Sequence, residues 1–318
     1  MYRIKTIPVG LIFLTLFSLL SMLLLVRVDY EWTFWLYRNR INGWGDFMGQ
    51  TFFEDGLIGG SDICMAVQLI LGASYFGSSM GPRFPRLQPY RPYLGFALFS
   101  ALVTGLGLVH SVKLIMGRAR PYLIAKKGLP FSHWFEFGPH HIFDGNFFGS
   151  FPSGHTATAI LLITFAYMLV SNPIHTLRTR IMGWIWGTLV LLFATGMAIG
   201  RSMTLHHWIS DGIGIILLAW ITIHLTFFTI LKVPQQVQYI KRHGEYPTQL
   251  GYWELQLLWR ILILDLAIMA VIFGIKAVFY QKVPWLILLL IPAIPCGYYT
   301  AKSIRKKYLS SMSVFMSD

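Results

Sequence analysis

The chain has 318 residues, of which 55% are hydrophobic and only 12% are charged. A soluble domain averages about 25% charged residues, so this composition excludes an ordinary water-soluble protein and indicates a polytopic membrane protein. The formal net charge is +13, but the basic residues lie in short loops between apolar segments, as in membrane proteins. Because no nucleic-acid recognition motif is present, we expect no nucleic-acid partner.

Apolar segments divide the chain into predicted membrane spans, each of which needs about 20 residues. Eight segments qualify: 7–27, 56–78, 94–117, 155–171, 181–200, 209–231, 256–275 and 283–300. The first follows a basic start and lacks a small-residue cleavage site, so it is predicted to be a retained signal anchor. The seventh contains Arg260 and Asp265, which we expect to pair with each other or with another helix. The predicted fold is an all-α membrane bundle.

Two segments between the spans, 28–55 and 131–151, are rich in Trp, Tyr and Phe. Aromatic side chains of this kind gather at the bilayer interface, so we expect short interfacial helices or re-entrant loops there. The two cysteines, Cys64 and Cys296, lie in or beside apolar segments. They indicate neither a disulfide framework nor a catalytic thiol.

The loop charges predict an orientation. With the N-terminus in the cytoplasm, the basic loops and the C-terminal tail all fall inside: Arg83, Arg86, Arg91, Arg178, Arg180, Lys232, Lys241, Arg242, Lys302, Arg305, Lys306 and Lys307. The acidic loop falls outside, with Asp29, Glu31, Asp46, Glu54 and Asp55. This arrangement follows the positive-inside rule and places the three polar clusters described next on the outer face.

The first polar cluster closes the third span, where Lys113 and Arg120 are seven residues apart. This spacing is two helical turns, so the two cations are predicted to share a face until Pro121 ends the helix. A cation at a helix end can also simply extend to the lipid headgroups. Arg118, between them, is a candidate for contacting a second phosphate or a headgroup.

The second cluster, Pro152-Ser153-Gly154-His155, opens the fourth span. The backbone N–H groups at a helix start have no partner within the helix and favour anions. Gly154 allows close approach, Ser153 can donate its hydroxyl or cap the helix, and His155 can act as a general acid because its intrinsic pKa lies near working pH.

The third cluster bridges spans five and six, with Arg201, His207 and Asp211. Asp211 follows His207 by four residues, which predicts one helical face for both. A carboxylate in that position can hold one imidazole nitrogen as N–H and leave the other free as a nucleophile. The alternative is a polar loop between two spans.

Taken in this order, Lys-x6-Arg-Pro, Pro-Ser-Gly-His and Arg-x5-His-x3-Asp resemble the signature of the type 2 phosphatidic acid phosphatase (PAP2) superfamily. The resemblance covers residues 113–211, about a third of the chain. One departure is visible: the family usually has Ser before the third-cluster arginine, and here that position is Gly200, with Ser202 after it. This departure puts one phosphate hydrogen bond in question.

The resemblance implies a mechanism. His207, oriented by Asp211, attacks phosphorus and forms a phosphohistidine, and His155 protonates the leaving oxygen. The phosphoryl oxygens are held by the cations and by the second cluster, that is by Lys113, Arg120, Ser153, Gly154 and Arg201. No metal and no cofactor is required, because the cations neutralise the phosphate.

The predicted function is hydrolysis of a lipid phosphate monoester or diphosphate at the outer face, with lipid A or undecaprenyl diphosphate favoured. The alternatives are a lipid phosphotransferase with the same intermediate, a phosphatase of a soluble sugar phosphate, and a non-catalytic lipid-binding or transport protein. The resemblance favours the bacterial inner membrane, with the site facing the periplasm and both termini in the cytoplasm. The expected partners are the lipid substrate and the membrane, and the oligomeric state stays open.

The resemblance also predicts two parts: a phosphatase core at 1–232, with six spans, and a C-terminal extension at 233–318, with two. Outside the three clusters, His140, His141 and Asp144 could suggest a metal site, but no fourth ligand is evident, so we interpret them as part of an interfacial loop. His110 is interpreted as a packed or hydrogen-bonded helix residue.

Overall fold

The computed structural model describes residues 9–52, 56–80, 83–136 and 149–316. This part of the chain is helical and contains no β-strand. Seven of its helical segments are long and apolar enough to cross a membrane, and many large apolar side chains on their outer faces are exposed, for example Phe13, Trp184 and Phe279 at 71%, 68% and 73%. These features are those of an integral membrane protein and confirm the predicted all-α bundle.

The bundle is built from α-helices linked by a few shorter turns of other helix types. The α-helices are α1 (Val9–Arg38), α2 (Asn42–Gly49), α4 (Gly60–Ser79), α5 (Arg91–Ser100), α6 (Val109–Met116), α7 (Pro121–Lys127), α8 (Gly154–Ile160), α9 (Ile163–Ser171), α10 (Leu177–Met203), α11 (Ile209–Leu225), α12 (Val233–His243), α13 (Trp253–Gln281) and α14 (Leu290–Met316). The shorter elements are η2 (Pro85–Tyr90), η3 (Ala101–Leu108), η5 (Thr226–Ile230), η6 (Thr248–Leu250) and η7 (Pro284–Leu289).

All eight predicted spans correspond to helices. The span predicted at 56–78 is α4, which has 20 residues but is not among the seven segments that are apolar enough to cross a membrane. It nevertheless belongs to the bundle: one face packs against α5 and α8, and the other is exposed, for example at Leu69 and Ile70. The first span is longer than predicted, because α1 continues through the aromatic segment to Arg38. Part of the expected interfacial region is therefore the end of a spanning helix, followed by the short helix α2.

The helices around α8 and α11 form the core of the bundle. α11 packs against α1, α10 and α8, while α9 and α10 form a hairpin beside them. The centre is filled by buried apolar side chains such as Ala157, Ile160, Met197 and Ile215. Since α8 begins at Gly154 and α11 at Ile209, this packing brings the starts of the two helices that carry the second and third clusters to one end of the bundle.

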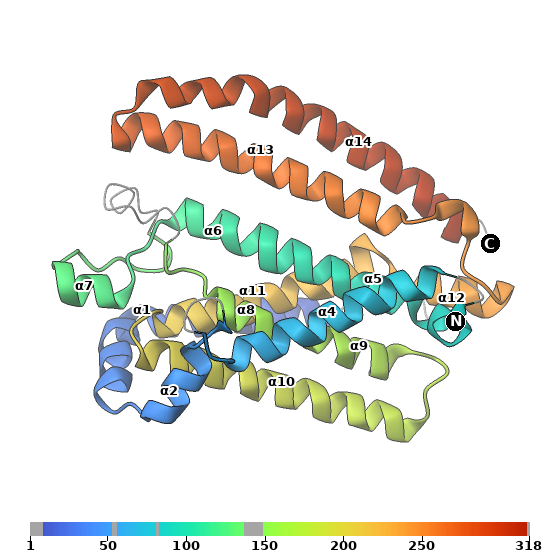
Figure 1. Ribbon diagram of the computed structural model, residues 1–318, viewed down its shortest axis with the longest axis horizontal. Coiled ribbons are helices and arrows are strands. Elements are labelled where there is room, and N and C mark those ends of the chain that lie inside the picture. The colour runs from blue at the N-terminus through green and yellow to red at the C-terminus, as the bar shows by residue number, and fades with distance from the viewer. Residues whose placement is uncertain (1–8, 53–55, 81–82, 137–148, 317–318) are drawn as a thin grey trace.

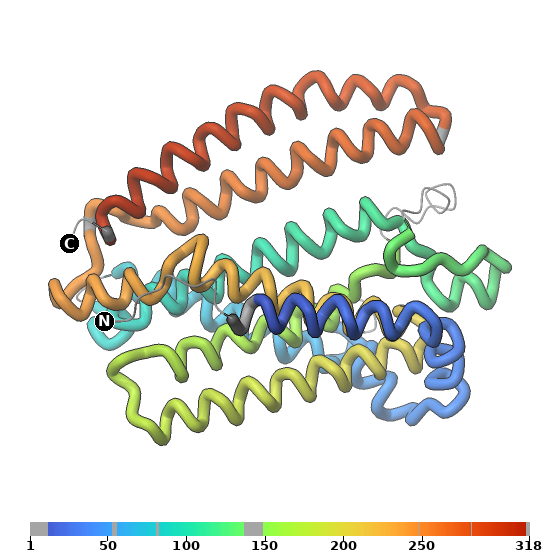
Figure 2. The backbone as a smooth tube through the Cα atoms, turned by 180° about the vertical axis from the view of Figure 1, so that it is seen from behind, coloured from blue at the N-terminus to red at the C-terminus, as the bar shows by residue number. Residues whose placement is uncertain are grey.

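The two ends of the bundle differ in the segments they carry. Figures 1 and 2 show η2, the α9–α10 connection, α12 and the end of α14 at one end, and α2, α7 and the end of α1 at the other. The predicted cytoplasmic basic segments thus share an end, and the three polar clusters lie at the opposite end. Which side of the membrane each end faces stays a prediction.

The helices α13 and α14 form a long hairpin along α6 and α5 (Figure 1). Polar contacts fasten α13 to the rest of the bundle at three levels. Near its start, Glu254 accepts hydrogen bonds from Tyr75 (3.0 Å) and Tyr246 (2.6 Å). In the middle, Asp265 accepts from the Ser111 hydroxyl at 2.6 Å.

The third contact lies at the other end of α13, where the Lys276 ammonium donates to the carbonyls of Leu114 and Ile115, both at 2.7 Å. Arg260 donates to Ser303 of α14 at 2.8 Å, so Arg260 and Asp265 each bond to another helix, which is one of the two expected arrangements. Because charged groups in the membrane interior are costly unless partnered, these contacts make α13 a specific neighbour of α6.

Candidate functional site

The first cluster lies where α6 ends. Gly117, in the left-handed conformation (φ 57°), follows the last helical residue and its N–H donates to the Lys113 carbonyl. The helix therefore ends at Met116, four residues before Arg120, because glycine accepts this conformation without strain. Pro121 instead begins α7, with Arg120 as the extended residue before it. The prediction that Lys113 and Arg120 share one helix is thus wrong: Lys113 is buried in the last turn of α6, and Arg120 is half-buried at the start of α7.

The second cluster forms the start of α8. The Ser153 hydroxyl accepts a hydrogen bond from the Thr156 hydroxyl at 3.0 Å and from the Thr156 N–H at 3.4 Å, so Ser153 caps the helix. Both of these bonds use the oxygen as acceptor, which leaves the hydroxyl proton available for a further partner. His155 lies in the first turn, and its buried Nε2 has no hydrogen-bond partner among the described residues.

The third cluster spans the turn between α10 and α11. Arg201, 2% exposed, lies in the last turn of α10 and donates to the Gly49 carbonyl at 2.6 Å. His207 lies in the turn, and Asp211 lies in the first turn of α11. The expectation of a shared helical face is therefore wrong, but the two side chains still meet: His207 Nδ1 is 3.3 Å from Asp211 Oδ2, which also accepts from the Trp208 N–H at 2.9 Å.

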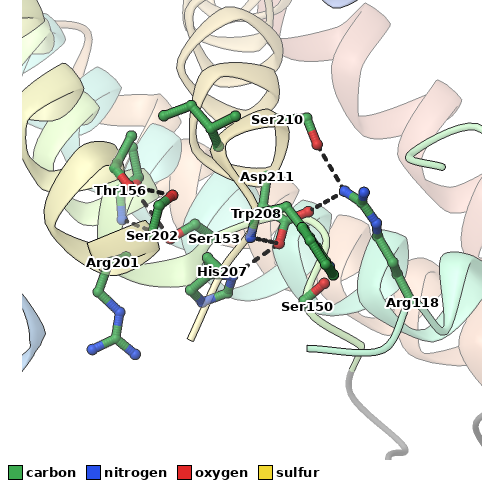
Figure 3. A network of polar contacts seen from close by, with 12 residues as sticks. Arg118, Ser150, Ser153, Thr156, Arg201, Ser202, His207, Trp208, Ser210 and Asp211 are labelled. Atoms are coloured by element: carbon green, nitrogen blue, oxygen red, sulfur yellow. Dashed lines mark hydrogen bonds and ion pairs between the residues drawn. The ribbon is translucent and has the colours of Figure 1, made fainter. Parts of the chain in front are cut away.

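Backbone and side-chain contacts join the three clusters at one place, and Figure 3 shows Ser153 beside His207 and Asp211. The Ser153 N–H donates to the Asp211 carbonyl at 3.2 Å, which ties the second cluster to the third. A Cβ on Gly154 would lie 3.9 Å from Lys113 Nζ, so the first cluster reaches the second. The third cluster meets the first through Trp208, whose indole N–H donates to the Ala119 carbonyl at 2.8 Å. The structure thus brings the predicted site residues together.

The electrostatic setting of His207 follows from this convergence. Burial is the main reason that the pKa of His207 falls well below the ordinary 6.5, and the charges of Lys113, Arg201 and Arg120 lower it further. The imidazole is therefore neutral at working pH and keeps a lone pair on one ring nitrogen. An ionised Asp211 carboxylate can accept hydrogen bonds but cannot donate them. We therefore assign the proton of the His207 ring to Nδ1, which leaves the lone pair on Nε2.

The departure from the family pattern at Gly200 has a structural reason. A Cβ on Gly200 would lie only 2.6 Å from Met48 Cβ, because α2 packs directly against α10 there. A serine would collide with this contact. Ser202 does not take over the missing role, since its hydroxyl donates to the Ala198 carbonyl of its own helix at 3.0 Å. The contact between α2 and α10 also positions the Gly49 carbonyl that holds Arg201.

Two buried residues have roles that sequence reasoning did not predict. Arg118, expected to contact a phosphate or a headgroup, instead donates to Asp211 Oδ1 at 2.8 Å and to Asp29 at 2.7 Å. Asp29, expected in the acidic loop on the outer face, instead lies on α1 and is 1% exposed. A carboxylate directly after an apolar segment was a signal for such a role, because a charge within a spanning helix needs a partner.

The remaining candidates from the sequence are the loop residues His140, His141 and Asp144 and the two cysteines. His140, His141 and Asp144, as well as most of the aromatic loop, lie outside the described residues. Within residues 9–52, 56–80, 83–136 and 149–316, no group of three or more His, Cys, Asp or Glu side chains could hold a metal ion. Cys64 is buried and Cys296 is exposed, and both are free.

Comparisons with known proteins agree with the geometry. Residues 93–234 match the family model of the PAP2 superfamily, and this segment contains every candidate site residue. Neither the comparison with curated proteins nor the comparison with solved structures found a match. Members of this superfamily are phosphatases, acting on phosphate esters. The three clusters, joined at one end of a membrane bundle, thus lie in a segment of the chain that matches the PAP2 superfamily.

Proposed function

We propose that this protein is a membrane lipid phosphatase that hydrolyses a phosphate monoester or a diphosphate through a phosphohistidine on His207. The observation that carries the proposal is the buried His207, whose Nδ1 lies 3.3 Å from Asp211 Oδ2, in the field of the charges of Lys113, Arg120 and Arg201. A binding protein would need the cations but not an oriented nucleophile. A phosphatase needs both.

In the first half of the reaction, the His207 Nε2 lone pair attacks phosphorus while the bond from phosphorus to the lipid oxygen breaks. That oxygen takes a proton from His155. The negative charge of the bound phosphate stabilises the protonated form of His155 before this transfer. The phosphoryl oxygens are held by Lys113, by the planar guanidinium groups of the two arginines, and by the Ser153 hydroxyl and Gly154 N–H. Removing one cation should raise the barrier by about 3 kcal/mol, by analogy with the loss of one oxyanion donor.

In the second half, water attacks the phosphohistidine and the bond between phosphorus and Nε2 breaks. His155, now neutral, takes the proton from that water, and inorganic phosphate leaves. Asp211 keeps the proton on Nδ1 throughout, so that Nε2 returns as the lone-pair nitrogen. Both half-reactions balance in bonds and protons. The mechanism needs no metal ion, because Lys113, Arg120 and Arg201 neutralise the charge of the phosphate.

A lipid is the favoured substrate because of where the site lies. Lys113 and Arg201 are in the last turns of α6 and α10, whereas Gly154 and Asp211 are in the first turns of α8 and α11. A phosphate bound there lies at the depth where spanning helices end, which is the headgroup level. We propose lipid A or undecaprenyl diphosphate, met at the outer face of a bacterial inner membrane, with 1–232 as the phosphatase core and 233–318 as an extension.

The test is phosphate release by the purified chain in detergent, measured over lipid A, undecaprenyl diphosphate, phosphatidylglycerol phosphate, phosphatidic acid and a soluble sugar phosphate. His207→Ala should abolish release while lipid binding survives. His206→Ala is the matched control: this neighbouring imidazole contacts Thr204 rather than Asp211 and its loss should leave most of the activity. Equal activity of His207→Ala and the wild type would refute the mechanism.

Two further arms separate the alternatives. A phosphotransferase releases little phosphate when one lipid is supplied alone and more labelled product when a second lipid is added. Radiolabelled substrate should leave an acid-labile label on the wild-type protein and none on His207→Ala, because the phosphorus–nitrogen bond is hydrolysed in acid. Activity lost to a chelator would point to a metal ion instead of the cations.

A further inference from the structure

Arg118 is fully engaged inside the protein. Its guanidinium is 1% exposed and donates to four acceptors: Asp211 Oδ1 (2.8 Å), the Ser210 hydroxyl (2.7 Å), Asp29 Oδ2 (2.7 Å) and the Ser132 carbonyl (2.8 Å). The rings of Phe131 and Trp208 lie 5.4 and 5.1 Å from its central carbon. Because four of its five N–H groups are paired and the side chain is 1% exposed, the guanidinium is not available to a phosphate, although Arg120 lies only two residues away.

Asp29 anchors this arrangement from α1. Its Oδ2 accepts from both Arg118 and the Ser210 hydroxyl, and its Oδ1 accepts from the Ser210 N–H at 3.0 Å. Ser210 is in the first turn of α11, directly before Asp211. Asp29 therefore holds both the guanidinium and the backbone that carries the carboxylate of the candidate site.

The two oxygens of Asp211 are thereby assigned to different partners. Oδ1 accepts from Arg118, whereas Oδ2 accepts from the Trp208 N–H and lies 3.3 Å from His207 Nδ1 (Figure 3). A carboxylate held on both sides cannot rotate. If Arg118 were absent, the Asp211 side chain could turn, and the hydrogen bond that selects the His207 tautomer would weaken.

We propose that Asp29 and Arg118 are positioning residues that act on the reaction through Asp211. The proposal rests on the proposed function, since it concerns the same nucleophile. It separates the two arginines of the first cluster: Arg120 faces the phosphate, and Arg118 orients the carboxylate behind the nucleophile. It also gives α1, which lies outside the segment that matches the family model, a part in positioning the nucleophile.

The energetics favour a role beyond packing. Three charged groups, each at most 1% exposed, form a chain from Asp29 through Arg118 to Asp211. Buried ion pairs often stabilise no more than apolar side chains of similar size would. Orientation of the nucleophile is a benefit that such apolar side chains could not supply.

The experiment is a double-mutant cycle. Arg118→Gln, Asp211→Asn and the double variant are purified in detergent, and kcat and KM for phosphate release are measured on phosphatidic acid or undecaprenyl diphosphate, whichever the wild type turns over faster. Single-turnover conditions are used for slow variants. Thr33→Val is the matched control, because Thr33 of α1 accepts from the Ile209 N–H and so holds the same helix start without touching the carboxylates.

Arg118→Gln should lower kcat by about 10²-fold, the cost of a misplaced catalytic group, with KM changed by less than about threefold, because an interaction made in the transition state is lost. In the Asp211→Asn background, the same substitution should lower kcat by less than about twofold, because the two residues act as one unit. Thr33→Val should keep kcat near that of the wild type.

If Arg118→Gln does not fold, as judged by size-exclusion chromatography, the same cycle is run with Asp29→Asn, for which kcat should fall by about tenfold. The inference is overturned if the full effect persists in the Asp211→Asn background, if it falls on KM, or if Thr33→Val loses as much activity. An active wild type with an unaffected Arg118→Gln refutes this inference alone, whereas a wild type that releases no phosphate from any lipid refutes the proposed function as well.

Discussion

The contact between Gly200 and Met48 gives a prediction whose size follows from the geometry. A methyl group on Gly200 would lie 2.6 Å from Met48 Cβ and 3.0 Å from Met48 Cγ. Ordinary contact between carbon atoms is about 3.5–4.0 Å, so α2 would have to move by about 1 Å. Forced insertion of a methyl group into a packed contact costs about 1–3 kcal/mol.

Gly200→Ala should therefore lower the thermal unfolding midpoint. The matched control is Gly187→Ala in the same helix, where the added Cβ would make an ordinary contact of 3.4 Å with Ala166. Both substitutions gain the same helix propensity, so their difference isolates the steric cost. We expect Gly200→Ala to unfold on the order of 5 °C below Gly187→Ala.

The same shift should reach the candidate site. Met48 and Gly49 are neighbours on α2, and the Gly49 carbonyl holds the Arg201 guanidinium at 2.6 Å. Gly200→Ser, which restores the residue usual in the family, should therefore lower phosphate release rather than raise it. Unfolding midpoints are read by fluorescence in detergent and release by a phosphate assay. Equal midpoints for the two alanine variants, or a gain of activity in Gly200→Ser, would show that α2 does not pack as described.

Two further predictions concern pH and the C-terminal hairpin. Because the pKa of His207 is lowered in the folded protein, the unfolded chain binds a proton below pH 6.5 that the folded chain does not. The wild type should thus lose up to about 1.4 kcal/mol of stability per pH unit below that point, relative to His207→Gln; parallel pH curves of the unfolding midpoint would contradict this. Lys276→Met removes two hydrogen bonds to carbonyls of α6 and should destabilise the protein by about 1–3 kcal/mol, whereas Lys302→Met, at an exposed position of α14, should not. Thermal unfolding of both variants checks this, and equal midpoints would mean that α13 is not fastened at Lys276.

The sequence by itself determined the class of the molecule and predicted which residues meet at the candidate site. Long apolar segments leave the backbone no alternative to helices in a membrane, so the spans could be counted from composition. The contact between His207 and Asp211 was also predictable. Two side chains four residues apart lie close together both in a helix and in a tight turn. The cations and the serine were found because phosphate chemistry requires such groups close together.

Tertiary structure alone decided the second layer of the site. Arg118 and Arg120 have the same side chain two residues apart, and only the packing of α1 against α11 sends the first to Asp29 and Asp211. Asp29 is separated from its partners by 89 residues or more, a distance over which local patterns carry no information. Gly200 and Lys276 are also explained by contacts between helices. Gly200 packs against Met48 of α2, and Lys276 donates to carbonyls of α6. Such contacts exist only once the helices have packed together.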